Sequence, residues 1–478
     1  MNGTNSRFDF RAPVPDLDEL GHVHFIAIGG AGMSGVARVM LARGCRVSGS
    51  DAKDSPVMTA LATEGAEVHV GHDAAHLDGV DTVVISSAIR ESNIELVTAR
   101  DRGLRVLHRS QALASTMAAS RRVAVAGANG KTTTTSMLTV ALQHCGADPS
   151  FAAGGELAKH GTNAHWGTGA VFVAEADESD GSFLVYRPEV AIVTNVQPDH
   201  LDFYGTFDNV KAAYAEFAGS LLGGGLLVAC HDDPGSLALA QDARAAGRRV
   251  LTYGWTPEAD IVLSDHVSRG LLSRVSLRDA EGETHSLRIN IPGRHNLLNA
   301  AAAFTAATAG LGQEPARVLE GLFGFTGTRR RFEPKGTASG VSVVDDYAHN
   351  PGKVAAVVST AAELVGDGRL VVVFQPHLYS RTRDFASEFA AALAPADRII
   401  LMEVYGARED PIPGVSSELI RTALHGLRPD ADVQVISSWS AVAPEAARRT
   451  KPGDLVLTVG AGDVTMLGPE ILRALESA

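Results

Sequence analysis

Residues 121–138 read RRVAVAGANGKTTTTSML, an apolar run followed by a glycine turn and a helix-forming stretch. The Walker phosphate loop, G-x-x-x-x-G-K-[ST], has four residues between its glycines. Here Gly127 and Gly130 enclose only two. Lys131 and Thr132 nevertheless follow the second glycine at the start of the expected helix. The stretch therefore predicts an α/β domain built around a phosphate site.

The chemistry of this loop follows from its position at a helix N-terminus. Backbone N–H groups and the positive end of the helix dipole favour an anion there. Lys131 is expected to reach the β- and γ-phosphates, and the Thr132 hydroxyl to ligate Mg²⁺. A plain strand–turn–helix joint with a chance lysine is the alternative.

Outward from this loop, short apolar runs alternate with helical patterns in both directions, as in parallel α/β sheets. We predict strands at HVHFIAIGG, CRVSGSD, DTVVISSA and RVLHR before the loop, and at VFVAEAD, EVAIVTNV and GLLVAC after it. Further strands are expected near 341–344, 370–374, 397–401, 432–436 and 454–458. The prediction is a polar, loose tail (1–20), a Rossmann-like domain (21–118), a central P-loop ATPase-like domain with a parallel sheet (119–327) and a Rossmann-like C-terminal α/β domain (328–478).

Composition limits the function classes. The 478-residue chain is 45% hydrophobic and 20% charged, with net charge −13. Such a length predicts about three domains. The acidic balance argues against nucleic-acid or anionic-membrane binding, and no apolar run reaches the length of about 18 residues that a membrane span needs. Cys45, Cys145 and Cys230 form no C-x-x-C, which excludes a disulfide framework and favours a cytoplasmic protein.

Acidic and histidine residues follow two strands of the central domain. Glu175, Asp177, Glu178 and Asp180 follow one strand, and Asp199 with His200 follows another. Ligands of open α/β sheets bind at this edge, and a P-loop needs a metal partner there. The acidic cluster is equally typical of a solvated turn, and the histidine of a structural residue.

GGAGMSG contains G-x-G-x-x-G at Gly30, Gly32 and Gly35, and Asp51 follows Gly32 after nineteen residues. This pattern fits a dinucleotide fingerprint. It indicates only a phosphate-bearing ligand on that helix, and a nucleoside diphosphate fits as well as NAD.

Two loops of the third domain carry further polar groups. VVDDYAHNP brings Asp346 and His349 to a strand end, and FQPHLYSRTR brings His377, Arg381 and Arg383 after another. Arginine forks suit carboxylates and phosphates, while an ion-paired surface loop explains each stretch equally well. GAGD (460–463) is predicted to be a tight turn.

In their order and spacing these motifs resemble the Mur ligases of bacterial cell-wall synthesis, over essentially the whole chain after the tail. The motifs that carry the resemblance are GGAGMSG (29–35), GKTTTT (130–135), EADESDGSFL (175–184), IPGRHNLLNA (291–300), RRRFE (329–333), DDYAHNP (345–351) and FQPHLYSRTR (374–383). Within that family the likeness is to the branch that adds L-alanine to UDP-N-acetylmuramate.

The resemblance implies an ATP- and Mg²⁺-dependent amide ligase that forms an acyl phosphate on the sugar's lactyl carboxylate, which the amino group then attacks. It implies a catalytic set of Lys131, Glu175, His200, His349 and Arg381. The other roles that it implies are ATP binding (Gly127, Ala128, Asn129, Gly130, Lys131, Thr132, Thr133, Asn296, Asn299, Arg329, Asp346), UDP-sugar binding (Gly30, Gly32, Ser34, Gly35, Asp51, Ser86, Arg109), amino-acid or intermediate binding (His349, His377, Arg381, Arg383) and metal ligation (Thr132, Glu175, His200). The partners are small molecules, and the chain is expected to be a monomer or homodimer.

One position separates the branches of the family. Ligases that add later residues carry a lysine, carbamylated in the active enzyme, fourteen positions after the histidine that aligns with His200, whereas this chain has Tyr214. Departures from the alanine-adding pattern are Ala128-Asn129 for Thr-His, Gln197-Pro198 before Asp199, and Asn350 for a second histidine, followed by Lys353.

Three alternatives remain open. A paralogue could use the same chemistry on another amino acid or carboxylate, in peptide recycling or a specialised pathway. A nucleotide-binding regulator would bind MgATP without turnover. A nicotinamide-dependent oxidoreductase rests on G-x-G-x-x-G alone, since nothing downstream supplies hydride chemistry.

Overall fold

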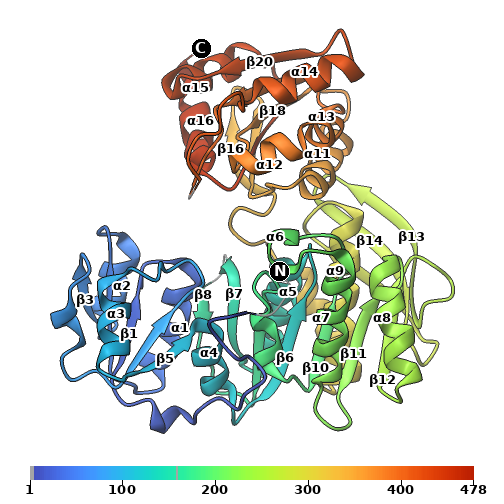
Figure 1. Cartoon of the computed structure of the whole chain (residues 1–478). Helices are drawn as coiled ribbons and strands as arrows, with labels where there is room; N and C mark the ends of the chain where they lie inside the picture. Colours follow the sequence, from blue (N-terminus) through green and yellow to red (C-terminus); the bar gives the residue numbers. More distant parts are fainter. Residues whose placement is uncertain (1–4, 158–159, 408, 478) are drawn as a thin grey trace. The chain divides into compact units, whose positions relative to one another are not determined.

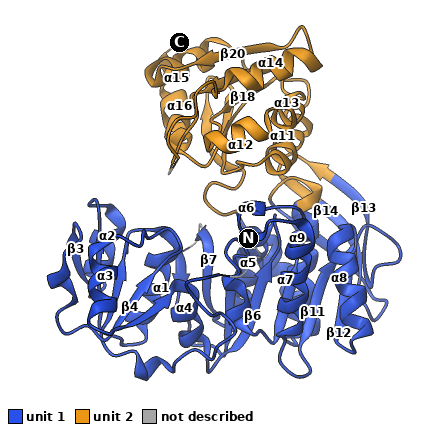
Figure 2. Cartoon of the chain, in the orientation of Figure 1, with its two compact units in different colours: residues 1–267, 274–290, 296–326 blue, residues 268–273, 291–295, 327–478 orange. Residues whose placement is uncertain are grey.

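The structure of the chain is a computed structural model that describes residues 5–157, 160–407 and 409–477. Contacts divide these residues into two compact units, coloured separately in Figure 2. Unit 1 comprises residues up to 267 with 274–290 and 296–326, and unit 2 comprises 268–273, 291–295 and 327 onward. Each unit is built on parallel-dominated sheets (Figure 1).

The first sheet of unit 1 has the strand order β3-β2-β1-β4-β5, and every neighbouring pair is parallel. Its strands are β1 (Val23–Ile26), β2 (Val47–Asp51), β3 (Glu67–Val70), β4 (Thr82–Ile85) and β5 (Arg105–His108). The connecting helices are α1 (Ala31–Ala42), α2 (Pro56–Thr63), η2 (Ala74–Leu77), α3 (Ile94–Asp101) and α4 (Arg109–Met117). The Rossmann-like first domain is thereby confirmed.

The second sheet of unit 1 has the order β15-β14-β13-β12-β11-β10-β6-β9-β7-β8. Its strands are β6 (Arg121–Ala126), β7 (Ser150–Leu157), β8 (Thr162–His165), β9 (Val171–Glu175), β10 (Val190–Val193), β11 (Leu226–Cys230), β12 (Arg249–Gly254), β13 (Ile261–Arg269), β14 (Leu272–Arg278) and β15 (Thr284–Ile289). β6 lies between β9 and β10, parallel to both. The loops after these three strands therefore meet at one edge, where ligands of α/β sheets bind.

The helices around this sheet are α5 (Lys131–His144), η3 (Ser182–Tyr186), α6 (Leu201–Tyr204), α7 (Phe207–Gly219), α8 (Pro234–Ala245), α9 (Arg294–Thr305), η4 (Ala306–Gly310) and α10 (Pro315–Phe323). β6, β10 and β11 are almost entirely buried, as expected of strands covered on both faces. The β7–β8 hairpin and the strands from β12 onward were not predicted from the sequence.

Unit 2 contains a sheet of order β16-β17-β21-β18-β19-β20. The strands are β16 (Glu333–Ala338), β17 (Val341–Asp346), β18 (Leu370–Phe374), β19 (Arg398–Met402), β20 (Asp432–Ile436) and β21 (Leu455–Val459). Five of these match the predicted strands; β16 is an unpredicted antiparallel edge strand.

The helices of unit 2 are α11 (Pro351–Val365), α12 (Tyr379–Asp384), α13 (Ala386–Leu393), α14 (Glu418–Leu427), α15 (Trp439–Arg448), η5 (Asp463–Met466) and α16 (Leu467–Ser477). Side chains of α11, α13 and α14 share one apolar core with the sheet, and those of α15 and α16 share another. Helices thus cover both faces, which confirms the α/β architecture predicted for the third domain.

The N-terminal segment differs from the loose tail that was predicted. Residues 5–20 pack on unit 1: Phe10 is 4% exposed, and Leu17 and Leu20 are buried, the latter after the short helix η1 (Leu17–Glu19). The segment is polar on average, but its spaced apolar side chains enter the core. The average composition of the segment therefore did not predict this packing. Residues 1–4, the start of the predicted tail, lie outside the described residues.

Candidate active site

The phosphate loop after β6 owes its shape to the segment after β10. Gly127 has φ 134°, and a Cβ there would collide with Oγ1 of Thr194. Asn129 N donates to Oδ1 of Asn195 at 2.9 Å, and Thr194 Oγ1 donates to the Asn129 carbonyl at 2.5 Å. Gly130, with φ 86°, leads into α5. The neighbouring strand's loop thus supports the short turn, so the longer Walker spacing is not needed to build it.

Lys131 is held inside this cradle. Its Nζ donates to the Gly127 carbonyl at 2.6 Å and to Oε1 of Glu178 at 2.8 Å. Burial by itself would lower the pKa of Lys131, but nearby Glu178, Asp177 and Glu175 outweigh it and raise that pKa. The lysine is therefore a fixed positive charge at the loop.

Thr132 and Glu175 form the oxygen pair expected for a metal. Thr132 Oγ1 donates to Glu175 Oε1 at 3.0 Å, and Gly154 N donates to Glu175 Oε2 at 2.5 Å. Within the described ranges, Oδ1 of Asn129 and Oε2 of Glu178 are buried without a hydrogen-bond partner. Unfilled oxygen acceptors beside a hydroxyl–carboxylate pair fit a hydrated Mg²⁺ ion.

The protein supplies only part of such a coordination shell. Among the described residues, no group of three or more His, Cys, Asp or Glu side chains is arranged to hold a metal. Mg²⁺ in nucleotide sites typically uses one or two protein oxygens, with phosphates and waters completing the octahedron. The Thr132–Glu175 pair suits this second kind of site.

His200 lies at the border of this cluster. Its Nε2 is 3.9 Å from Glu178 Oε1 and 3.9 Å from Asp199 Oδ2, and its backbone is left-handed with φ 53°. Tyr214, at the position that distinguishes the family branches, is 1% exposed and meets Phe183 edge-on at 5.4 Å. The position thus holds a buried aromatic side chain.

Two residues predicted to bind ATP, Asn296 and Asn299, lie on α9 beside the phosphate loop. Asn299 Nδ2 donates to Oδ1 of Asn296 at 3.3 Å, and a Cβ on Gly130 would come within 2.6 Å of Asn299 Oδ1. The other two predicted ATP contacts belong to unit 2. Arg329 is exposed, and Asp346 is buried, accepting N–H bonds from Phe332 (2.8 Å) and Ala348 (2.7 Å).

Two departures from the family pattern contact each other. Asn129 Nδ2 donates to Oε1 of Gln197 at 3.0 Å, and Gln197 Nε2 donates to Asp233 at 3.2 Å. In unit 2, Asn350 Oδ1 accepts from Lys353 N at 2.9 Å and caps α11. Asn129 therefore finds its partner in Gln197, within its own unit.

This pairing predicts a small effect of restoring histidine at position 129. Asn129→His removes one exposed hydrogen bond, worth about 1 kcal/mol, and leaves the backbone support of the loop intact. We expect the KM for ATP to change by less than about fivefold. Steady-state kinetics over a series of ATP concentrations measure this KM in the natural chain and in the variant. A large gain in kcat would instead mean that the natural loop is impaired.

Most of the residues predicted for the UDP-sugar lie at or beside the N-terminal turns of α1. Gly30 is the N-cap of α1, and Gly29 N donates to Asp51 Oδ2 at 3.0 Å. A Cβ on Gly32 would lie 3.0 Å from Arg109 Nη1, and Arg109 Nη2 donates to Asp177 Oδ2 at 2.7 Å. Three other residues were predicted to bind the UDP-sugar. Ser34 and Gly35 are buried on α1, and Ser86 is half-buried in the segment after β4.

A buried carboxylate lies behind Asp51. Glu95 is fully buried, and accepts from Ser50 Oγ at 2.6 Å, while His72 Nδ1 and His76 Nδ1 lie 2.9 and 2.8 Å from its oxygens. Burial would raise the pKa of Glu95, but hydrogen bonds from His24, Ser50 and His76 outweigh it and lower that pKa to about 2.

This depressed pKa predicts acid sensitivity of unit 1. The stabilisation from ionised Glu95 is fully present above its unfolded-state pKa near 4.5 and is lost as pH falls toward 2. The loss amounts to about 3 kcal/mol. Urea unfolding of Glu95→Gln between pH 2 and 7 should show a flatter acid limb than the natural chain. Parallel limbs would contradict this assignment.

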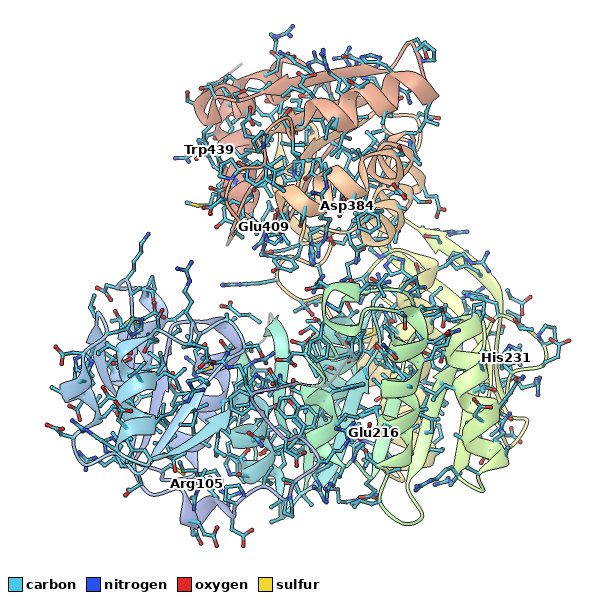
Figure 3. The ribbon with its side chains drawn as sticks, in the orientation of Figure 1. Arg105, Glu216, His231, Asp384, Glu409 and Trp439 are labelled. Carbon is cyan, nitrogen blue, oxygen red and sulfur yellow. The ribbon has the colours of Figure 1, made fainter. Side chains whose placement is uncertain are left out.

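In unit 2 the predicted amino-acid residues partly converge. The ring of His349 lies 5.8 Å from that of His377, which stacks on Tyr405, and Arg381 Nη1 donates to the His349 carbonyl at 3.4 Å. Arg383 is exposed and pairs with Asp384 (labelled in Figure 3), so it is not brought to the histidines.

His349 is neutral in this setting. Burial, then Lys353 and Arg381, lower its pKa well below the usual value, although its hydrogen bond to Tyr347 opposes them. Its Nδ1 lies 2.9 Å from the Tyr347 carbonyl, so Nδ1–H donates there and Nε2 keeps its lone pair. A neutral imidazole with a free lone pair can accept a proton.

Sequence reasoning missed several polar links. Asp177 and Glu178 were noted only as part of an acidic cluster, yet they pair with Arg109 and Lys131. In unit 2, Arg330 Nη2 donates to the carbonyls of Gly460 (2.7 Å) and Gly462 (3.0 Å), so one arginine nitrogen binds both ends of the predicted turn. The acidic residues and glycines that follow strand ends indicated in the sequence that these loops are functional. The sequence did not indicate which residues these loops would contact.

These features define a class. A glycine turn with a buried lysine, beside a hydroxyl–carboxylate pair at the carboxyl edge of a parallel sheet, is the site of a P-loop nucleotide-binding α/β protein.

Comparison with known proteins narrows the class. Family profiles match the Mur ligase family catalytic domain over residues 22–121, the Mur ligase middle domain over 125–307, and the Mur ligase glutamate ligase domain over 330–462. The chain belongs to the Mur ligase family.

Two relatives are named UDP-N-acetylmuramate–L-alanine ligase. That of Renibacterium salmoninarum is 54% identical over 96% of this chain and 97% of its own, and that of Saccharopolyspora erythraea is 53% identical over 96% and 94%. Among solved structures, UDP-N-acetylmuramate–alanine ligase of Thermotoga maritima is 28% identical, with TM-score 0.80 over 95% of this chain and 99% of that chain. A murein peptide ligase of Psychrobacter arcticus is 25% identical, with TM-score 0.69 over 96% and 99%.

In the described part of the chain, no helix is both long and apolar enough to cross a lipid bilayer.

Proposed function

We propose that the chain is an ATP-dependent ligase that joins L-alanine to the lactyl carboxylate of UDP-N-acetylmuramate in peptidoglycan precursor synthesis. The observation that carries the proposal is the buried Lys131 beside the Thr132–Glu175 pair, within a chain more than half identical to alanine-adding relatives. ATP is the second substrate and Mg²⁺ the metal.

The proposed reaction has two steps. A carboxylate oxygen of the sugar attacks the γ-phosphorus of ATP, and ADP leaves, giving an acyl phosphate. The amino group of alanine then attacks the acyl carbon, and phosphate leaves with the former carboxylate oxygen. Phosphorylation is needed because a free carboxylate is a poor electrophile. Catalysis is mainly positioning and charge neutralisation.

The residues of unit 1 serve the first step. Lys131 exchanges its present partners, the Gly127 carbonyl and Glu178, for phosphate oxygens and offsets their charge. Thr132 and Glu175, with His200 nearby, would hold Mg²⁺, which when bound would neutralise phosphate charge. Arg109 and the α1 N-terminus bind and orient the diphosphate of the UDP-sugar.

The residues of unit 2 serve the second step. Nε2 of His349 accepts the proton that the amino group of alanine releases as it attacks the acyl carbon, because Nδ1–H of His349 is directed to the Tyr347 carbonyl. Arg381 binds the amino-acid carboxylate. The reaction consumes ATP, which places the proposed enzyme in the cytoplasm; either a monomer or a homodimer is compatible with this chemistry.

Phosphate release tests the proposal. The purified chain is incubated with MgATP and UDP-N-acetylmuramate, and with L-alanine, glycine, L-serine, D-glutamate or an alanyl peptide in turn. We expect phosphate release largely confined to L-alanine. Preference for the peptide would favour a recycling paralogue with the same chemistry, which the departures at Gln197 and Asn350 motivate. Binding of MgATP without release for any acceptor would favour a regulator.

A further inference from the structure

Residues 5–11 form an ordered segment, here called the N-terminal strap, between the first and second sheets of unit 1. We propose that the strap is a positioning element that joins the sugar-binding part of unit 1 to the ATP-binding part and holds the loop at 176–181 in its binding geometry. The identity of the substrates in this proposal rests on the proposed function; the mechanical role does not.

One end of the strap is attached to loops of the first sheet. Arg7 Nη1 donates to the carbonyls of Ser87 at 3.3 Å and Ile89 at 3.0 Å. Arg7 Nε pairs with Glu91 Oε1 at 2.6 Å. Three contacts to one short loop fix this arginine, whose side chain is only 21% exposed.

The other end is attached to elements around the second sheet. Arg11 meets Glu216 of α7 through two bonds of 2.5 and 2.7 Å, and Arg187 Nη2 donates to the Arg11 carbonyl at 2.5 Å (Glu216 is labelled in Figure 3). At the first end of the strap, Asn5 Nδ2 also donates to the Asp180 carbonyl at 3.4 Å, in the loop after β9 of the second sheet. Each exposed pair is worth little alone, but the set connects two sheets through one segment.

The middle of the strap packs on a buried histidine. The rings of Phe8 and Phe10 each lie 5.2 Å from that of His108, which is fully buried. His108 Nε2 lies 3.3 Å from Asp180 Oδ2, and Ser87 Oγ donates to the same oxygen. Burial would raise the pKa of Asp180, but hydrogen bonds led by His108 outweigh it and lower that pKa. A charged, buried carboxylate thus depends on an imidazole that the two phenylalanines hold in place.

Asp180 lies near the end of the loop 176–181, which also carries two residues of the candidate active site. Within 176–181, Asp177 pairs with Arg109 and Glu178 pairs with Lys131. The histidine beneath the strap directly precedes Arg109 in the chain. The strap therefore contacts this loop at Asp180, directly through Asn5 and indirectly through His108, so a shift of Asp180 would be transmitted to both pairs.

The test separates positioning from mere stabilisation. Phe10→Ala removes the aromatic contact with His108, and Phe10→Leu keeps an apolar side chain there as the matched control. Phe385→Ala, an exposed aromatic of unit 2, controls for loss of any phenylalanine. Arg7→Gln/Arg11→Gln removes the charged attachments and leaves both phenylalanines of the strap in place, and it carries the test if Phe10→Ala does not fold.

Two readouts are used. In the ligand-free chain, hydrogen exchange of amides 176–181 should speed up about tenfold in Phe10→Ala and in the double arginine variant, but not in the controls. In turnover, the KM values for UDP-N-acetylmuramate and for ATP should rise about fivefold, because both ion pairs shift, while the KM for L-alanine stays unchanged. The exchange readout is independent of the substrates, so it decides the strap's role even if the proposed function fails.

The proposal is overturned if the variants melt earlier but exchange at 176–181 stays at the natural rate. It is equally overturned if all substrates' KM values move together, since that pattern indicates general loss of the folded chain. Rescue of both readouts by Phe10→Leu supports it.

Discussion

Lys131→Met is expected to lower kcat/KM by about 10³-fold, the largest effect of any single change in unit 1. Lys131 Nζ sits between the Gly127 carbonyl and Glu178, and nearby carboxylates raise its pKa. Methionine keeps the length of the side chain but removes the charge that offsets the phosphates. Initial rates of phosphate release over a series of ATP concentrations measure the loss.

The same change also damages the fold, and the two effects can be separated. Glu178 is 2% exposed, so Lys131→Met leaves a buried carboxylate unpaired, at a cost of about 3–5 kcal/mol. Adding Glu178→Gln removes that charge and should recover most of the stability without recovering activity. Recovery of activity in the double variant would show that Lys131 acts only on the fold.

Glu175→Gln is expected to lower kcat by about 10²-fold and to raise the Mg²⁺ concentration for half-maximal rate. Glutamine preserves the shape of the side chain: its amide oxygen can accept from Gly154 N, and its NH2 group can donate to Thr132 Oγ1, which at present donates to the carboxylate. What is lost is the negative charge that holds the metal. A Mg²⁺ titration at saturating ATP measures the shift.

Glu189→Gln is the matched control for this change. Glu189 directly precedes β10, at the opposite edge of the same sheet, and pairs with Arg121 on a partly exposed surface. Its loss should cost at most about 1 kcal/mol of stability and leave the Mg²⁺ titration unchanged. An equal Mg²⁺ dependence of the two variants would remove Glu175 from the metal site.

The parts of the fold that were predicted from sequence are those with local signals. The apolar runs of β6 and β10 and the glycine stop after α5 identify strands and a helix without reference to distant residues. Polar side chains at parallel strand ends must meet at one edge, so the approach of Lys131 and Glu175 could also be anticipated. The exact domain borders and the roles of individual site residues remain predictions.

What could not be predicted depends on contacts between distant segments. The hydrogen bonds from Arg109 to Asp177 and from Asn129 to Gln197 join residues that follow different strands. They can form only once the sheet brings those strands together. The strap was expected to be loose because its polar residues dominate the average, yet Phe10 is buried against His108. Such pairs leave no periodic pattern in one sequence.

The fate of the carboxylate oxygen tests the central claim most directly. UDP-N-acetylmuramate labelled with ¹⁸O in its lactyl carboxylate is incubated with the chain, MgATP and L-alanine, and the released phosphate is analysed by mass spectrometry. The acyl-phosphate route expects one ¹⁸O in each phosphate released, in step with alanyl product. Unlabelled phosphate accompanying product formation would contradict the account.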